Sequence, residues 1–164
     1  MKASPRGVLS AIAAVAFGAL AAALVSQHAF DMQPCPWCVL QRLIFTAIGV
    51  VALVGLAWTS TVGSRVVALG TMALAGAGIA AALWHYFVAA TSTSCNLTLA
   101  DRIMSASGLS SLLPEVFEAR ATCADAAVSL LGVPYVLWAL ALFVVIEFAA
   151  ATLLVRALRD RPGT

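Results

Sequence analysis

The chain has 164 residues, of which 63% are hydrophobic and only 10% are charged, and its formal net charge is +2. A soluble domain has about 45–50% apolar and about 25% charged residues, so this composition excludes a soluble globular protein and indicates an integral membrane protein. The small net charge comes with no basic patch, so nothing indicates a nucleic-acid partner.

Four apolar stretches are each long enough to cross a bilayer, because about 20 residues at a rise of about 1.5 Å cover a hydrocarbon core of about 30 Å. The predicted spans are 7–26, 43–64, 66–90 and 128–155, with outer loops at about 27–42 and 91–127. The sequence therefore predicts an all-α fold, a single membrane domain over 1–164 that forms an integral membrane four-helix bundle. The first stretch exceeds the signal-peptide h-region of about 7–15 residues, which favours a retained span over a cleaved leader.

Small residues recur at four-residue spacing in the first and third stretches. In lipid, this spacing lets helix backbones approach closely. We therefore expect these residues to lie at contacts between helices of a compact bundle. They are Ala14, Gly18 and Ala22 in the first stretch and Ala73, Ala77 and Ala81 in the third.

The basic residues predict the orientation of the chain, because Lys and Arg mark cytoplasmic loops. One side holds Lys2, Arg6, Arg65, Arg156, Arg159 and Arg161, and the other holds Arg42, Arg102 and Arg120. Both termini are therefore expected in the cytoplasm. Both long loops are expected on the outer side, together with all four cysteines, where disulfides persist.

The first outer loop ends in a close cysteine pair, Cys35 and Cys38, directly before the second span. Covalent haem attachment would need a histidine after the second cysteine, but Val39 stands there. A four-thiolate zinc site would need a second close pair, whereas Cys95 and Cys123 are far apart in the sequence. We therefore predict no metal ligand among these residues, with a four-thiolate zinc site as the poorly supported alternative.

The cysteine pair is better suited to redox chemistry than to structural support. A bridge between residues so close in sequence closes too small a loop to stabilise the fold much. The start of a helix lowers the pKa of a thiol, and Arg42 follows Cys38 by one helical turn. That cation can stabilise a thiolate at Cys38 or hydrogen-bond to the carbonyl oxygen of a lipid-soluble quinone. An arginine that snorkels at a helix end is the alternative.

The second outer loop contains a short amphipathic segment after Pro114, a residue suited to the first turn of a helix. Its apolar residues Leu112, Leu113, Val116 and Phe117 share one side of a helical projection, opposite Glu115 and Glu118. The pattern predicts a short interfacial helix on the membrane surface. The alternative is a solvent-exposed loop helix without membrane contact.

Four short motifs occur in order along the chain. They are Gln27-His28, Pro34-Cys35-Pro36-Trp37-Cys38-Val39-Leu40-Gln41-Arg42, Leu112-Leu113-Pro114-Glu115-Val116-Phe117 and Leu131-Gly132-Val133-Pro134. Together they strongly resemble the disulfide bond formation protein B (DsbB) family. Their order differs from that of the vitamin K epoxide reductase-like family, in which the quinone-facing cysteine pair follows the loop cysteines.

The resemblance implies a bacterial inner-membrane enzyme with periplasmic cysteines. Such an enzyme re-oxidises a periplasmic DsbA-type thiol oxidoreductase and passes two electrons to ubiquinone or menaquinone. By position, the partner's thiolate would attack Cys95, and the released Cys123 would attack Cys35. Cys38 would then face the quinone, with Arg42 stabilising the complex. The alternative is a non-enzymatic membrane scaffold whose outer loops are held by structural disulfides.

Three further residues have open roles. His85, near the outer end of the third span, is expected either to line the quinone pocket, as a histidine does in relatives, or to be a neutral interface histidine. Trp37 is expected to anchor the chain at the membrane interface. Glu147 lies toward the cytoplasmic half of the fourth span, where we expect protonated packing or a hydrogen bond within the bundle.

Overall fold

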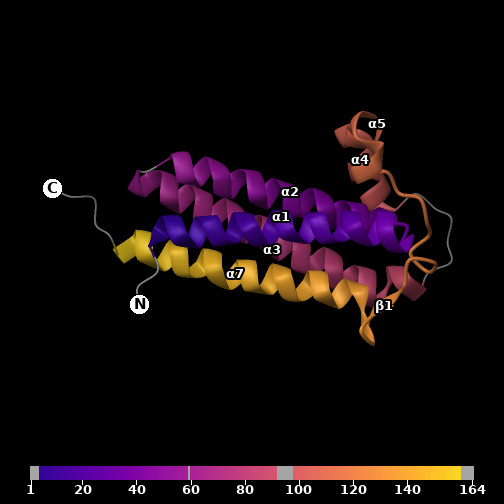
Figure 1. Ribbon diagram of the computed structural model, residues 1–164. Helices are drawn as coiled ribbons and strands as arrows, with labels where there is room; N and C mark the ends of the chain where they lie inside the picture. The colour runs from indigo at the N-terminus through magenta and orange to yellow at the C-terminus, as the bar shows by residue number, and fades with distance from the viewer. Residues whose placement is uncertain (1–3, 59, 92–97, 160–164) are drawn as a thin grey trace.

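The computed structural model describes residues 4–58, 60–91 and 98–159. Its four long helices run side by side, and each is long and apolar enough to cross a membrane (Figure 1). They are α1 (Pro5–Phe30), α2 (Pro36–Ala57), α3 (Thr61–Phe87) and α7 (Tyr135–Arg159). The predicted all-α four-helix bundle is therefore confirmed.

The first residues of α2 form a capped helix start that determines where the cysteine pair lies. Cys35 is the N-cap, with an extended backbone, and its sulfur accepts a hydrogen bond from the Cys38 amide at 3.4 Å. Pro36 occupies the first turn, where its missing N–H costs nothing. Ser4 and Ser60 cap α1 and α3 in the same way. Helix α2 thus begins before the uncharged apolar run, with Cys35 as its cap and Cys38 in its first turn.

A short hairpin delays the start of α7 until Tyr135. Strands β1 (Ser129–Leu130) and β2 (Val133–Pro134) pair in antiparallel register. The two residues between them, Leu131 and Gly132, both have positive φ, at 55° and 79°. Positive φ at both central positions is the geometry of a tight hairpin turn, and it favours glycine. The apolar residues at the beginning of the fourth stretch therefore form a turn instead of helix.

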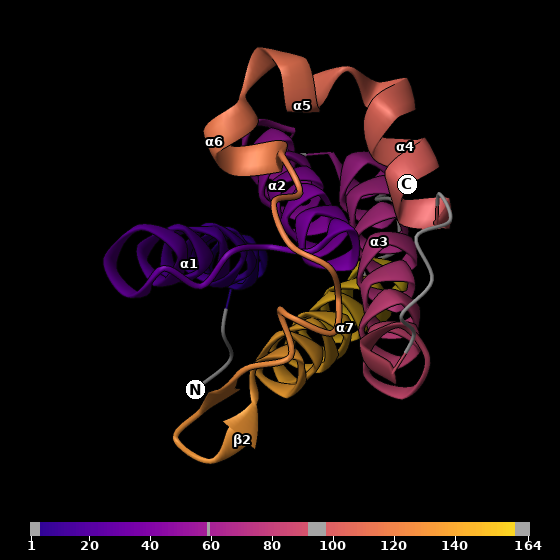
Figure 2. The same cartoon turned by 90° about the vertical axis from the view of Figure 1, so that its right-hand side faces the viewer.

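The long loop between α3 and α7 folds into short helices that arch over the start of α2 and the end of α3 (Figure 2). A capping box joins Thr98 and Asp101 at the start of α4, and Gly108 ends this helix with a φ of 66°. Pro114 begins α6 in its first turn, as predicted. The elements are the 3-10 helix η1 (Ala89–Thr91), α4 (Leu99–Ser107), α5 (Leu109–Leu112) and α6 (Pro114–Phe117).

The apolar residues of the loop do not share one face as expected, because the helix is interrupted at Leu113. Phe117 is buried against Val39 and Met104, whereas Leu112 and Leu113 are exposed. The loop is therefore held on α2 by Phe117 and its packed neighbours, while Leu112 and Leu113 face outward.

Two aromatic rings form the centre of the bundle core. Phe45 of α2 and Phe143 of α7 stack with centroids 4.0 Å apart and an interplanar angle of 6°. Phe143 is fully buried and lies against Gly78 of α3, where even a Cβ atom would clash with the ring. Gly49 is packed in the same way against Phe17. These two glycines therefore permit the close approach of α3 to α7 and of α2 to α1.

The prediction for the small residues of α1 was wrong. Ala14, Gly18 and Ala22 are all exposed, and no side chain or neighbouring backbone lies within 4 Å of the Cβ position of Gly18. In α3, Ala73 and Ala77 are also exposed, and only Ala81 is buried. Small-residue spacing indicates a possible contact face, but it does not show which face of the helix is covered.

Candidate redox site

The Cys35 and Cys38 thiols lie within one turn at the start of α2. Their sulfurs are 2.9 Å apart, and both residues are free thiols. Cys35 is completely buried, while Cys38 is partly exposed. Trp37 is buried beside Trp84, with centroids 6.3 Å apart, so it belongs to the protein core instead of the surface expected for an interfacial anchor. The pair is therefore enclosed by protein, and Cys38 is the more exposed of the two residues.

His85, from the outer end of α3, reaches the cysteine pair from the neighbouring helix. Its Nε2 lies 3.5 Å from Cys35 Sγ, and its Nδ1 lies 3.3 Å from Nε2 of Gln41. His85 and Gln41 are both buried. A buried imidazole between a thiol and an amide is oriented by both neighbours and can exchange a proton with the sulfur.

Cys123 lies in the long loop, after α6, and its side chain reaches the cysteine pair. The backbone amides of Arg120 and Ala121 donate to the carbonyl of Pro34 at 2.9 and 3.2 Å, which fastens the loop beside Cys35. The Cys123 side chain is buried and interacts with those of Cys35 and His85. Three of the four cysteines predicted as site residues therefore meet at one point. Cys95 lies outside the described residues.

The thiols of this cluster differ in acidity. The interaction with Cys35, assisted by His85, lowers the pKa of Cys123 to about 5. The same interaction raises the pKa of Cys35, because ionising a buried thiol beside another thiolate is unfavourable. In the reduced cluster, Cys123 is thus the thiolate of this pair at neutral pH.

This difference predicts distinct alkylation profiles in the reduced protein. The rate of Cys123 alkylation by iodoacetamide should be constant at neutral pH and should fall as the pH drops through about 5. Mass spectrometry of Cys95→Ser protein, sampled during alkylation, would give the rate at which Cys123 is modified. As a control, Cys35→Ala should move the midpoint toward the ordinary thiol value of about 8.5. A midpoint near that value with Cys35 present would contradict the assignment.

Arg42 is buried, and its guanidinium is held by acceptors on two other helices. Nη1 donates to Gln27 Oε1 of α1 at 2.6 Å and to the Val116 carbonyl of α6 at 3.1 Å, while Nη2 donates to the Ala23 carbonyl at 3.2 Å. Gln27 in turn donates to the Glu115 carbonyl at 3.3 Å. Arg42 therefore joins α1, α2 and the loop, in addition to placing a positive charge near Cys38. A snorkelling arginine would leave its guanidinium in solvent, and this one does not.

A cavity of about 880 Å³ lies between α1, α2 and α7, at the end of the bundle that holds the cysteine pair. Cys38, Gln41, Arg42 and His85 line one part of it. The remaining wall is mainly apolar, with contributions from Phe45 and from alanines of α1. The predicted thiol, cation and histidine therefore border the same space, and a mainly apolar cavity with a few polar groups is the usual form of a small-molecule site.

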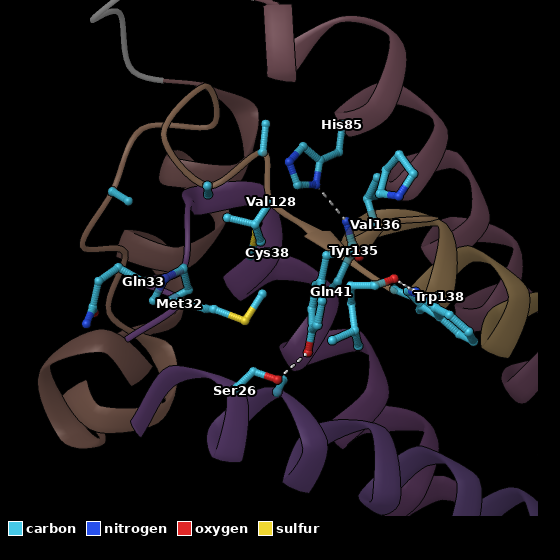
Figure 3. Close-up of a pocket in the computed structure, with 18 of the residues that line it drawn as sticks. Ser26, Met32, Gln33, Cys38, Gln41, His85, Val128, Tyr135, Val136 and Trp138 are labelled. Atoms are coloured by element: carbon cyan, nitrogen blue, oxygen red, sulfur yellow. Dashed lines mark hydrogen bonds between the residues drawn. The ribbon is translucent and has the colours of Figure 1, made fainter. Parts of the chain in front are cut away.

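Two cavity residues were missed in the sequence. Ser26 of α1 and Tyr135 of α7 meet across the cavity, with their hydroxyl oxygens 3.2 Å apart (Figure 3). In the same view, His85 and Gln41 form a second hydrogen-bonded pair above them. Polar side chains at the outer ends of apolar spans were the available signal, but their spacing in the sequence does not show that they meet.

Comparison with known proteins gives a match along almost the whole chain. The family model described as "Disulfide bond formation protein DsbB" matches residues 5–154. The chain belongs to the DsbB family. Among its relatives is a disulfide bond formation protein B of Herminiimonas arsenicoxydans, 38% identical over 144 residues that cover 86% of this chain and 89% of the relative. Another, from Ralstonia nicotianae, is 35% identical and covers 95% of this chain and 98% of the relative.

Membership of the DsbB family agrees with the membrane fold and the thiol cluster, and it makes the chain a disulfide-forming membrane protein.

One polar residue stands apart from this cluster. Glu147 is partly buried in α7, and its Oε2 has no hydrogen-bond partner among the described residues. It does not line the cavity of the DsbB site. We assign it no part in the redox chemistry.

Proposed function

We propose that this DsbB-family chain re-oxidises a periplasmic DsbA-type thiol oxidoreductase and transfers two electrons to a membrane quinone, either ubiquinone or menaquinone. The observation that carries the proposal is the meeting of Cys123, Cys35 and Cys38 at the edge of an apolar cavity. Cys123, at one end of this row of thiols, lies in the loop, and Cys38, at the other end, lies on the wall of the cavity. Such a row can move electrons from a protein thiol to a lipid-soluble acceptor.

The relay proceeds by thiol–disulfide exchange, in which each attacking thiolate forms one S–S bond and releases one thiolate. The partner thiolate attacks Cys95 of a Cys95–Cys123 disulfide, and Cys123 leaves as a thiolate. Cys123 then attacks Cys35 of the Cys35–Cys38 disulfide, and Cys38 leaves as a thiolate in turn. The second partner thiol resolves the mixed disulfide and leaves the partner oxidised. Cys95 finally returns to Cys123 and releases Cys35.

The residues of the cavity fit a quinone head group. When bound, a quinone accepts the two electrons that restore the Cys35–Cys38 disulfide, together with two protons. Cys38 lies on the wall of the cavity, and Arg42 supplies a fixed positive charge beside it. The hydroxyls of Ser26 and Tyr135 offer hydrogen bonds to a carbonyl oxygen. The apolar wall formed by Phe45 and the alanines excludes water from the sulfur.

The energetics favour an acceptor of this kind. DsbA-type proteins have reduction potentials of about −120 mV, which makes them unusually strong oxidants. Each 30 mV corresponds to about 1.4 kcal/mol for a two-electron couple, so only a stronger acceptor can re-oxidise them. A membrane quinone meets this requirement and is soluble where Cys38 lies.

The proposed orientation has the cysteines in the periplasm and both termini in the cytoplasm. It is supported by the excess of Lys and Arg near the termini. The described ends of α1 and α7, at Pro5 and Arg159, lie at the end of the bundle opposite the arch formed by α4 and α5 (Figure 1). A basic end and a cysteine-bearing end are therefore separated by the length of the helices.

The proposal is tested with purified protein, a reduced DsbA-type partner and a soluble quinone, following quinone absorbance. Wild-type protein should reduce the quinone at the expense of partner thiols, and Cys38→Ser should abolish the reaction. Glu147→Gln is a suitable control, because this residue lies outside the cavity and should retain activity. Absence of quinone reduction, or full turnover by Cys38→Ser, would instead favour a non-enzymatic scaffold with structural disulfides.

Tyr135→Phe should weaken the interaction with the quinone and leave thiol exchange intact. The substitution removes one hydroxyl and preserves the ring, so the expected rise in KM for the quinone is about 3- to 10-fold, the value of one neutral hydrogen bond. The rate at which the partner forms a mixed disulfide should not change. Ser26→Ala should give a smaller effect, because Tyr135 keeps its hydroxyl. An unchanged KM in Tyr135→Phe would exclude this hydroxyl from quinone binding.

A further inference from the structure

Besides the cavity, the thiol cluster contains a second arrangement that can bind a ligand. The donor atoms of Cys35, Cys38 and His85 all lie within 4.8 Å of one another. Cys123 interacts with two of these side chains and is the nearest further thiol donor described. A set of three cysteines and one histidine is one of the common donor sets of tetrahedral zinc sites.

The geometry of the first three donors is close to that of a metal site. Zinc sites have Zn–S distances of about 2.3 Å and Zn–N distances of about 2.0–2.1 Å. With tetrahedral angles, these distances place sulfur and nitrogen about 3.6 Å apart and two sulfurs about 3.8 Å apart. Cys35 Sγ and His85 Nε2 are already 3.5 Å apart. The two sulfurs, at 2.9 Å, would have to separate by rotation of the partly exposed Cys38 side chain. A two-residue spacing between cysteines also occurs in zinc sites.

The surroundings supply the second layer of interactions that metal ligands need. The Cys38 amide points at Cys35 Sγ and would partly neutralise a bound thiolate. His85 Nε2 faces Cys35, which leaves Nδ1 to the Gln41 side chain. An amide can present either its oxygen or its nitrogen after a half-turn, so Gln41 can accept the Nδ1 proton that a ligating imidazole carries. The start of helix α2 adds further positive potential.

We propose that the reduced site binds a thiophilic divalent cation of the Zn²⁺ class through Cys35, Cys38 and His85, with Cys123 as the fourth donor. Each ligating thiol gives up its proton, no electrons are transferred, and the sulfurs become unable to form disulfides. The oxidised site cannot bind in this way, because the Cys35–Cys38 bond occupies both sulfurs. Metal binding would therefore hold the relay in its reduced state. This inhibitory consequence rests on the proposed function, but the binding itself does not.

The binding experiment uses the full chain in detergent, reduced under anaerobic conditions and freed of reductant. Zn²⁺ is titrated against a chromophoric chelator, and Co²⁺ serves as the spectroscopic probe. Reduced protein should bind one metal per chain, and the Co²⁺ form should show thiolate-to-metal charge transfer and tetrahedral bands. Oxidised protein should show neither. Equal metal binding by the oxidised and reduced protein would overturn the proposal.

Variants identify the ligands in the same titration. His85→Ala and Cys38→Ser should each weaken Zn²⁺ binding by more than about 100-fold, and Gln41→Leu by about 10- to 100-fold, as expected for a second-layer residue. The control is His28→Ala, because His28 is exposed and interacts with Glu115 instead of the cluster. Circular dichroism would verify that each variant keeps its helices. Unchanged affinity in His85→Ala, or loss of binding in Cys95→Ser, would overturn the proposed ligand set.

Inhibition is measured separately. Zn²⁺ should slow quinone-dependent turnover of the reduced enzyme, and a chelator should restore it. If wild-type protein reduces no quinone at all, the proposed function fails, while the Co²⁺ spectrum still decides whether the metal site exists. Normal turnover of enzyme with bound Zn²⁺ would overturn the inhibitory role.

Discussion

Cys123→Ser should lower the rate of electron transfer from the thiol partner by at least about 10³-fold. This is the order of loss expected when the nucleophile of a covalent relay is removed. The reason is geometric. Cys123 is the described thiol that joins the loop to the buried Cys35, because its side chain interacts with that of Cys35. Quinone reduction driven by the partner's thiols measures the loss.

The same variant should keep the second half of the relay. Cys35 and Cys38 remain paired at 2.9 Å, and the cavity beside Cys38 does not depend on Cys123. A small dithiol that reduces the Cys35–Cys38 disulfide directly should therefore still drive quinone reduction at a rate within a few-fold of wild type. The matched control, Ala124→Ser, alters the same exposed turn at a residue that does not line the cavity. Full partner-driven turnover in Cys123→Ser would show that Cys35 is attacked by another route.

Arg42→Met should have the second large effect, on both quinone affinity and stability. The substitution removes the positive charge beside Cys38 and leaves Gln27 Oε1 and the Val116 carbonyl without their donor. Each buried acceptor left unpaired costs about 1–3 kcal/mol. Loss of a charged hydrogen bond to the ligand would raise KM for the quinone by about 10- to 100-fold. Quinone titrations and thermal unfolding in detergent measure the two effects.

Two variants separate the charge of Arg42 from its structural role. Arg42→Lys keeps the charge, but an ammonium cannot reproduce the planar arrangement of donors that reaches three acceptors, so it should lose stability more than quinone affinity. Gln27→Ala removes an acceptor and leaves the charge, and it should loosen α6 with little change in KM. Arg65→Met, at the opposite end of α3, serves as the distant control. An unchanged KM in Arg42→Met would exclude its proposed role at the quinone.

The bundle could be predicted from the sequence because its signals are local. Hydrophobic length gave the four helices, and Pro114 gave the start of α6. Burial inside the bundle was harder to predict, because a small residue such as Gly18 is equally suited to a helix contact and to the outer surface. Trp37 was misjudged for the same reason: its buried position depends on Trp84, which is distant in the sequence.

The residues of the site could be predicted one by one, but their contacts could not. Cys35, Cys38 and Arg42 share a short motif, and helical spacing is enough to place them together. The binding of the Arg42 guanidinium by Gln27 and the Val116 carbonyl depends on how α1 and α6 pack against α2. Such contacts join separate parts of the chain, so periodicity within one segment does not reveal them.

The stacked rings of Phe45 and Phe143 bear on whether protons can pass along the bundle from one end to the other. Phe45 lies on the wall of the cavity, and Phe143 fills the fully buried space behind it. Stacked aromatic rings carry no hydrogen-bonding group, so no proton can pass between these two. Protons taken up during turnover should therefore come from the same aqueous compartment that receives those lost by the thiols. Catalysis would then move no net charge through the bilayer, and the enzyme should work equally well in energised and de-energised vesicles.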